Sequence, residues 1–244
     1  MTHHNVEGDE LHLMHLGTTG YMLGSVLWIL CFRFLPGTPE ANMEAVWSVV
    51  KKCYKEDSSD TQYTNLTISS FCDPRSPNSN YPHLKGRGAE VKDVVKPLLA
   101  CWVHFREHIT DNYDNVRLML KAQVTIQETL TDHAMDLFLP PEASQGLMEC
   151  VDRVLHHYTI LANKADADNI ALWNITPKFH WLWHWSRKSI LLNPRRSNCM
   201  LDEDYVGVIK TCVAASVSGT PMEAVPKKVM ERILWGMHFL NLKD

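Results

Sequence analysis

The stretch Tyr21–Leu35, YMLGSVLWILCFRFL, decides the fold that this sequence predicts. It holds 15 residues, and Arg33 is the one charged residue among them. A helix that crosses a bilayer needs about 20 consecutive apolar residues. We therefore predict a buried core helix over residues 11–35, with a break near Gly17–Gly20 as an alternative, and we expect no membrane partner.

The chain beyond this helix carries start signals and apolar spacing of further helices. Pro36-Gly37 ends the first helix, and Thr38 followed by Pro39 is typical of a helix start. Strand signal is scarce, and we predict a mainly α fold: a helical bundle with at most one or two short strands, in one domain over residues 1–244. Residues 56–83, rich in Ser, Asn, Asp and Pro, predict a loop excursion. The other helices are expected over residues 38–55, 89–108 with a kink at Pro97, 110–135, 142–163, from Pro177 onward, 202–216 and 221–240.

Composition and charge exclude some classes of function. Hydrophobic residues make up 45% and charged residues 21% of the 244 residues, which is typical of a globular protein. The formal net charge of −4 gives no general attraction for nucleic acid, so any such binding needs a local basic patch. The seven cysteines are scattered without a CxxC pair, which favours reduced thiols and an intracellular location.

The segment Thr176–His184, TPKFHWLWH, carries the first candidate site. His180 and His184 are four residues apart, so they share one face of a helix and could bind a metal with a third ligand. The helix lacks the glutamate that follows the first histidine in zinc proteases. Trp181, Trp183 and Trp185 make it apolar nearly all round, which favours the alternative of a buried helix whose histidines bond to backbone or carboxylate groups.

Two further motifs follow this helix. Arg195 and Arg196, in the turn Asn193-Pro194-Arg195-Arg196, could clamp a phosphate or pair with the acidic residues after them. The run Asp202-Glu203-Asp204 begins another predicted helix, where the helix dipole favours acidic residues whatever their function. The functional alternative is that Glu203 ligates a divalent cation.

Two weaker motifs lie earlier in the chain. Asp9 and His12 are three residues apart and could face the same way, although Asp9 could equally be an ordinary helix cap. The segment Leu84–Glu90, LKGRGAE, places two cations and two glycines at a helix start. Backbone amides there could hold a phosphate, and a surface turn explains the same residues equally well.

Taken in this order, the motifs resemble the C-terminal part of the catalytic region of DNA transposases with an RNase H-like DDE core. The string also resembles uncharacterised, repeated open reading frames of protist genomes. In the transposase family a helical insertion separates the second catalytic Asp from the final Glu. The resemblance implies a partial RNase H-like remnant with an all-helical insertion. It matches Asp9 to the second catalytic Asp and Glu203 to the final Glu, and it matches framework positions to Lys85, Glu90, Lys178, His180 and His184.

The resemblance also implies ligands and partners. Asp9 and Glu203 would bind Mg²⁺ or Mn²⁺ if the site is complete, with His180 and His184 as additional metal candidates. DNA would be bound by a basic patch, and a nuclear location is expected for such a mobile-element derivative. That DNA-binding patch comprises Lys85, Arg87, Lys178, Arg187, Lys188, Arg195 and Arg196.

The chain departs from the family at the first catalytic Asp. That residue should lie on a strand upstream of Asp9, but only eight residues precede Asp9, and the parallel strands of the core have no counterpart. Carboxylates from several elements must converge in a two-metal site. We therefore expect a transposase-derived protein that is catalytically incomplete.

Two alternative functions remain at this stage. The first is a helical scaffold without catalysis, which requires an exposed apolar patch covered by a protein partner or a second copy. Candidates for that patch are Trp47, Trp102, Trp235 and Met237. The second is a metal-dependent hydrolase built on His180, His184 and nearby carboxylates.

Overall fold

A computed structural model of the chain describes residues 9–57, 61–109, 113–197 and 200–241. Throughout these residues the secondary structure is helical and no strand is present, which confirms the prediction of a mainly α helical bundle. The chain divides into two compact units, residues 1–198 (unit 1) and 199–244 (unit 2). The sequence analysis did not predict this boundary.

The first helix of unit 1 runs without interruption from Leu11 to Phe34. It is wound as a π-helix over Leu11–Thr19 (η2), as an α-helix over Gly20–Ile29 (α1), and again as a π-helix over Leu30–Phe34 (η3). By length and composition it is the one helix in the described part of the chain that could cross a membrane, yet 83% of its apolar window is buried inside the protein. The prediction of a buried core helix is therefore confirmed.

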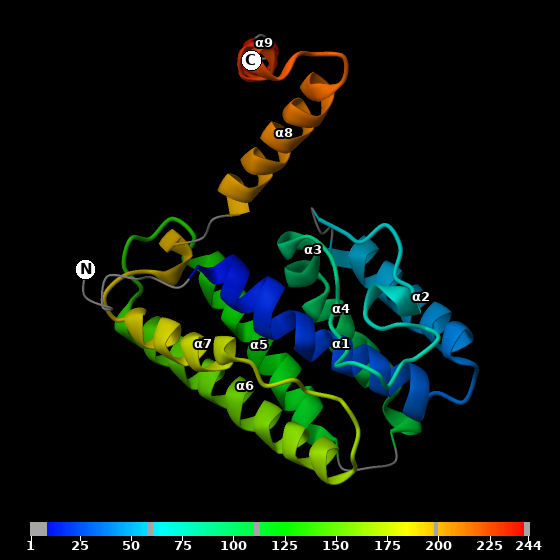
Figure 1. The fold of residues 1–244 in the computed structure, drawn as a ribbon. Coiled ribbons are helices and arrows are strands. Elements are labelled where there is room, and N and C mark those ends of the chain that lie inside the picture. Colours follow the sequence, from blue (N-terminus) through cyan, green and yellow to red (C-terminus); the bar gives the residue numbers. More distant parts are fainter. Residues whose placement is uncertain (1–8, 58–60, 110–112, 198–199, 242–244) are drawn as a thin grey trace. The chain divides into compact units, whose positions relative to one another are not determined.

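Six helices surround this core helix in unit 1. Packing runs from α7 to α6, from α6 to α5, from α5 to α4 and from α4 to α2, and both α7 and α2 return to the core helix. Figure 1 shows α5, α6 and α7 grouped on one side of α1, with α2, α3 and α4 on the other. The six helices are α2 (Pro39–Asp57), α3 (Gly88–Asp93), α4 (Val95–His104), α5 (Asp114–Asp132), α6 (Pro141–Ala167) and α7 (Pro177–Lys188).

The helix predicted over residues 89–108 is divided into two. The break falls at Val94, between α3 and α4, rather than as a kink at Pro97. A proline ring clashes with the carbonyl group four residues earlier, which here belongs to Asp93, so the helix is interrupted before Pro97. The second half ends at His104 instead of His108, and residues 110–112 of the next predicted helix lie outside the described residues.

The long segment between α2 and α3 is irregular but belongs to the core. Its one regular piece is the 3₁₀ turn Ile68–Ser70. Five of its apolar side chains are buried in the same hydrophobic core as the first helix, so the segment packs on the bundle as well as connecting two helices. These side chains are Tyr63, Leu66, Ile68, Phe71 and Leu84.

Three glycines on the core helix permit this packing. A Cβ atom at Gly24 would lie 2.7 Å from the Pro82 carbonyl carbon, and one at Gly20 would lie 2.6 Å from Nε2 of His83. Gly17 is covered in the same way by Lys178. We call Gly17, Gly20 and Gly24 the glycine face; they mark close contacts rather than a break in the helix.

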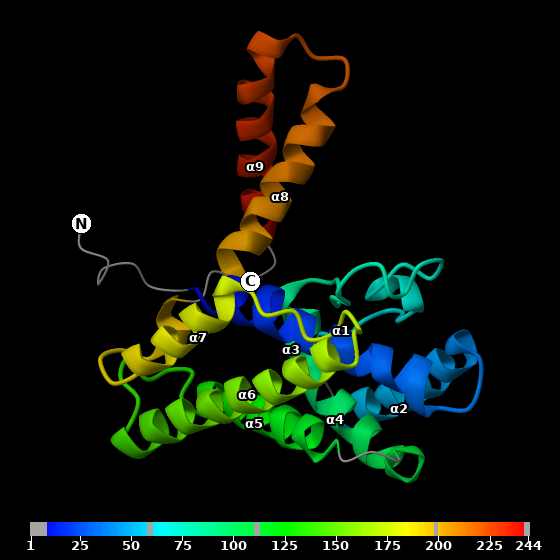
Figure 2. The same ribbon diagram turned by 60° about the horizontal axis from the view of Figure 1, so that its bottom comes forward.

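Unit 2 is a helical hairpin. It consists of α8 (Met200–Val217), the 3₁₀ turn Met222–Ala224 and α9 (Val225–Asn241), and the two long helices pack against each other (Figure 2). Gly219 has a φ of +67° in the connection, a left-handed conformation that favours glycine. Two helices bury little apolar surface, and side chains such as Met230, Leu234 and Trp235 remain exposed.

Replacing Gly24 by alanine should lower the free energy of unfolding by about 2 kcal/mol, because overpacking costs about 1–3 kcal/mol even after the gain in helix propensity. Gly146→Ala on α6 is the matched control, because nothing lies within 4 Å of its Cβ position. We expect that control to be stabilising. Urea denaturation measures the free energy of unfolding of both variants. A stabilised Gly24→Ala protein would contradict the close packing of residues 82–84 against the helix.

Candidate functional site

A lysine and a histidine from distant parts of the sequence meet on the glycine face. The side chain of Lys178, from the first turn of α7, crosses Gly17, where a Cβ atom would lie 2.8 Å from its Cδ and 3.5 Å from its Nζ. The His83 ring lies over Gly20. Lys85 follows two residues later, and its charge, like that of Lys178, acts on the His83 ring. We call Lys85, His83 and Lys178 the lysine site.

His83 is held in this site by an aromatic contact and by partial burial. Its ring meets Tyr21 edge-on, with the two ring centroids 4.5 Å apart. Burial lowers the pKa of His83 below its usual 6.5, the charges of Lys178 and Lys85 lower it further, and a hydrogen bond to the Leu16 backbone acts in the opposite direction. The ring is therefore neutral at pH 7.

The lysines of this site carry uncompensated charge. Among the described residues, no carboxylate lies within 4 Å of the ammonium group of Lys85 or Lys178. The backbone of Lys85 is fixed, because its amide donates to the Ser70 carbonyl at 2.8 Å and its carbonyl accepts from the Tyr63 hydroxyl at 3.1 Å. Two cations with no acidic partner, beside a neutral imidazole, form an arrangement that attracts an anion.

The segment Leu84–Glu90 does not form the phosphate loop that the sequence offered as one alternative. A Cβ atom at Gly86 would lie 2.1 Å from the Tyr63 hydroxyl oxygen, and one at Gly88 would lie 1.9 Å from Cδ1 of Leu11. Both glycines are thus required by packing. The Arg87 amide donates to the Glu90 carboxylate at 2.8 Å, and the Arg87 guanidinium binds the same carboxylate at 3.0 Å.

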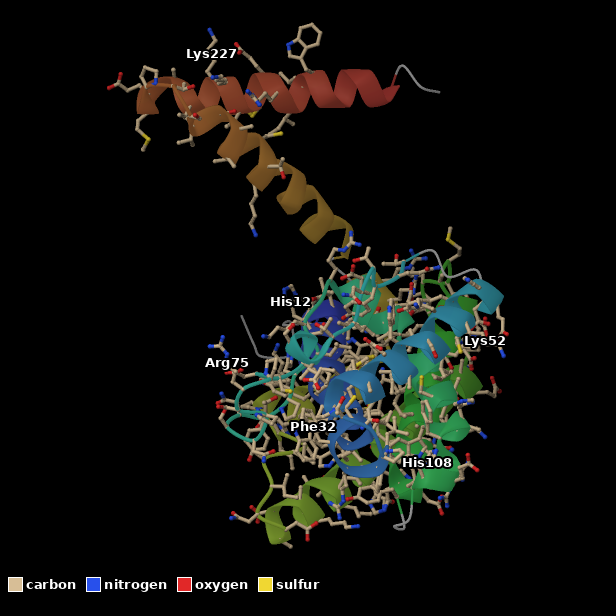
Figure 3. All side chains as sticks on the ribbon, turned by 90° about the vertical axis from the view of Figure 1, so that its right-hand side faces the viewer. His12, Phe32, Lys52, Arg75, His108 and Lys227 are labelled. Atoms are coloured by element: carbon tan, nitrogen blue, oxygen red, sulfur yellow. The ribbon has the colours of Figure 1, made fainter. Side chains whose placement is uncertain are left out.

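Asp9 acts as a helix cap. One carboxylate oxygen accepts the backbone N–H of Leu11 at 3.3 Å, and the other accepts the backbone N–H of His12 at 2.8 Å and lies 2.6 Å from Nδ1 of the His12 ring. His12 itself is at the surface of unit 1 (Figure 3). These bonds correspond to the structural alternative that we gave for Asp9.

Glu203 leaves the predicted catalytic pair untested. Its backbone lies in the first turn of α8, but its side chain lies outside the described residues, and it belongs to unit 2 whereas Asp9 belongs to unit 1. Within the described residues, no group of three or more His, Cys, Asp or Glu side chains is placed to hold a metal ion. Binding of Mg²⁺ or Mn²⁺ by Asp9 and Glu203 stays a prediction that depends on the Glu203 side chain.

His180 and His184 do not behave as the favoured interpretation expected. Both are exposed on α7, and they contact each other through their Nε2 atoms, 3.1 Å apart, rather than backbone or carboxylate groups. The helix is not apolar all round, because Trp181 and Trp183 are 49% and 39% exposed whereas Trp185 is buried. Its outer face is therefore aromatic and imidazole-rich.

The predicted basic patch divides into two kinds of residue. Lys178 crosses the glycine face, and the charges of Lys178 and Lys85 both act on His83. Arg187 is engaged by both carboxylate oxygens of Asp152, each at 2.8 Å, and stacks 4.7 Å from the centroid of Trp183. Arg196 donates to the carbonyls of Met135 and Asp136. The half-buried Lys188 and Arg195 lie near that end of α7, and Arg87 pairs with Glu90.

One polar pair at this helix was missed by the sequence analysis. His15 and Glu10 are both almost fully buried, and Nε2 of His15 lies 3.0 Å from Oε1 of Glu10. They are five residues apart, a spacing that aligns on the π-helix over Leu11–Thr19 and would not align on an α-helix. The available signal was the presence of two ionisable residues inside a segment predicted to be buried.

An exposed apolar surface is present in unit 1, but not at the predicted residues. Trp102 is buried, Trp47 is partly buried, Trp235 is exposed in unit 2, and the Met237 side chain lies outside the described residues. The exposed surface comes from the α5–α6 turn and the end of α7, which Asn193 joins by donating to the carbonyls of His133 and Asp136. Its side chains are Met135, Leu137, Phe138, Ile190 and Leu191.

A cavity of about 420 Å³ lies between α2, α4 and α5. Its lining combines carboxylates with lysines, and Lys96 donates to Asp57 at 2.9 Å across it. Four carboxylates line it against two lysines, so its formal charge is negative, unlike that of the lysine site.

Comparison with known proteins does not place the chain in a family. No protein-family model, curated protein or solved structure matches it.

Removing one lysine of the site should raise the pKa of His83, because the protonated imidazole then loses a repulsive neighbour. We expect Lys178→Met to raise it, and Lys121→Met on the exposed side of α5 to leave it unchanged. An NMR titration of the His83 ring measures the effect. An unchanged His83 pKa in Lys178→Met would mean that the two groups do not share a site.

Proposed function

We propose that this chain is a transposase-derived protein that binds nucleic acid through the lysine site. The observation that carries the proposal is that the charges of Lys85 and Lys178, which have no acidic partner among the described residues, both act on His83, beside one face of the core helix. Phosphate groups are recognised by such uncompensated ammonium groups. The proposed ligand is therefore the sugar–phosphate backbone of DNA.

The charge distribution supports local rather than general attraction. The whole chain carries a formal charge of −4, so a polyanion is repelled by most of the surface. Lys85 and Lys178 have no carboxylate partner among the described residues, and both of their charges act on the His83 ring. A neutral His83 beside them adds no charge of its own.

The outer face of α7 supplies a second contact for nucleic acid. Trp181 lies three residues after Lys178, and half of its surface is exposed. Exposed aromatic rings beside a basic groove stack on bases and contribute about 1–3 kcal/mol per base. We propose that Lys178 binds a phosphate and that Trp181 stacks on a neighbouring base of a single strand or a distorted duplex.

The ancestry part of the proposal rests on the order of motifs. Lys178, which the resemblance matches to a framework position near the catalytic site, crosses the glycine face, and Lys85, matched to another such position, acts on His83 beside it. Asp9, matched to a catalytic residue, is committed to capping the core helix. Lysines available for nucleic acid, together with an Asp9 that caps a helix, fit a descendant of a transposase that retains nucleic-acid contacts and has no complete catalytic site of its own.

Replacing either lysine by glutamine should weaken DNA binding by about 1–2 kcal/mol and reduce the slope of log K against log salt by about one. Lys178→Arg should retain most of the affinity, and Lys121→Gln is the control for an exposed lysine outside the site. Fluorescence anisotropy with short single- and double-stranded DNA, between about 50 and 200 mM salt, measures both quantities.

Three results would count against the proposal. They are the absence of binding at low salt, a salt-independent affinity, and equal losses in Lys178→Gln and Lys121→Gln. Trp181→Ala separates the two contacts, because it should weaken single-strand binding without changing the salt slope.

A second candidate function, a helical interaction protein, is favoured by the exposed apolar surface of Met135, Leu137, Phe138, Ile190 and Leu191. Asn193 and Arg196 fix the two segments that carry it. Exposed patches of this kind mark protein interfaces, and we propose a second copy of the chain as the partner.

Sedimentation measurements test this alternative independently of DNA. The unmodified protein should show a concentration-dependent dimer, and Leu191→Glu should abolish it. A protein that stays monomeric at all concentrations would remove the second copy as the partner.

A further inference from the structure

The outer face of α7 carries a pair of imidazoles whose geometry is that of a chelate. His180 and His184 are exposed, and their Nε2 atoms lie 3.1 Å apart with the rings nearly perpendicular, at 85°. In a neutral pair one Nε2–H donates to the lone pair of the other Nε2. The two nitrogens therefore face each other on the exposed side of the helix.

The separation of these nitrogens matches two ligands of one metal ion. Imidazole nitrogens bind Zn²⁺ at about 2.0–2.1 Å, so two nitrogens 3.1 Å apart subtend an angle of about 100° at the ion. This value lies between the right angle of square-planar or octahedral ions and the angle of tetrahedral ones. A small rotation of the exposed rings turns both lone pairs toward the ion, and each ring then carries its proton on Nδ1.

We propose that His180 and His184 form a bidentate site for late transition metal ions, namely Cu²⁺, Ni²⁺ and Zn²⁺. Imidazole suits these ions, whereas Mg²⁺ and Ca²⁺ require oxygen ligands. The site is independent of the proposed Mg²⁺ or Mn²⁺ ligands Asp9 and Glu203 and of the lysine site. It thus goes beyond nucleic-acid binding.

The site is open on its outer side. No third His, Cys, Asp or Glu side chain joins the pair within the part of the chain that the structure describes. Water or a donor group from another molecule completes the coordination, as in metal sites that bind an exogenous ligand. Trp181 and Trp183 flank the pair, with ring centroids 6.0 Å and 5.0 Å from that of His184.

The chain contains a natural control for sequence spacing. His104 and His108 are also four residues apart, but α4 ends at His104 and the backbone leaves the helix at Phe105. The same spacing on a broken helix does not bring two imidazoles onto one face. If metal binding depends on helix geometry, the pair on α7 should therefore bind the ion and the pair His104 and His108 should not.

Isothermal titration of the full chain with NiCl₂ and ZnCl₂ tests the proposal, with MgCl₂ as a negative control. All proteins carry His3→Ala and His4→Ala, because adjacent histidines also bind these ions. We expect one Ni²⁺ or Zn²⁺ ion at α7, bound at least about tenfold more weakly after either His180→Ala or His184→Ala. His104→Ala should leave the affinity unchanged.

Tryptophan fluorescence shows where on the chain the ion binds. Bound Ni²⁺ should quench tryptophan fluorescence through Trp181 and Trp183, and the quenching should disappear in His184→Ala. Both histidines are exposed, so these substitutions leave the fold intact, and circular dichroism checks this. The proposal is overturned if no ion binds, if affinity survives both substitutions, or if His104→Ala weakens binding as much as His184→Ala.

Discussion

Close packing against the glycine face of the core helix is the constraint on which unit 1 depends. At Gly17, Gly20 and Gly24 any side chain would overlap a neighbour, and two of these neighbours belong to residues 82–83. Each glycine lowers helix propensity by about 1 kcal/mol relative to alanine, a cost that the contacts must offset. The helix nevertheless runs unbroken from Leu11 to Phe34.

This packing also creates the chemistry of the lysine site. Because His83 lies directly on Gly20, it is partly buried and close to two lysines, and all three factors keep its ring neutral. Lys178 reaches the same face from α7, about a hundred residues further along the chain. The positive charge of the lysine site therefore follows from the close packing of two distant segments against the core helix. It needs no dedicated phosphate loop such as the one that Leu84–Glu90 suggested.

The sequence predicted those features that arise from local pattern. The apolar run Tyr21–Leu35 indicated the core helix, and Thr38-Pro39 and Pro177 marked helix starts that the structure confirms. Contacts between residues far apart in the sequence could not be predicted. Nothing in the sequence near Lys178 indicates that this side chain will lie against Gly17. The π-helix that aligns Glu10 with His15 was equally hidden, because periodicity arguments assume 3.6 residues per turn. Whether His180 and His184 are exposed depends on which side of α7 faces the core. Tryptophans occur on several sides of this helix, so the sequence did not indicate the buried side.

The lysine site depends on the meeting of residues 82–83 and α7 on the glycine face. The most direct measurement is an NOE experiment on labelled protein, read at the Gly20 and Gly17 α-protons. If these contacts exist, cross peaks are expected from Gly20 to the His83 ring and from Gly17 to the side-chain methylenes of Lys178. Their absence, with the Gly20 and Gly17 α-protons showing contacts to other residues instead, would contradict the placement of the lysine site and the nucleic-acid contacts proposed from it.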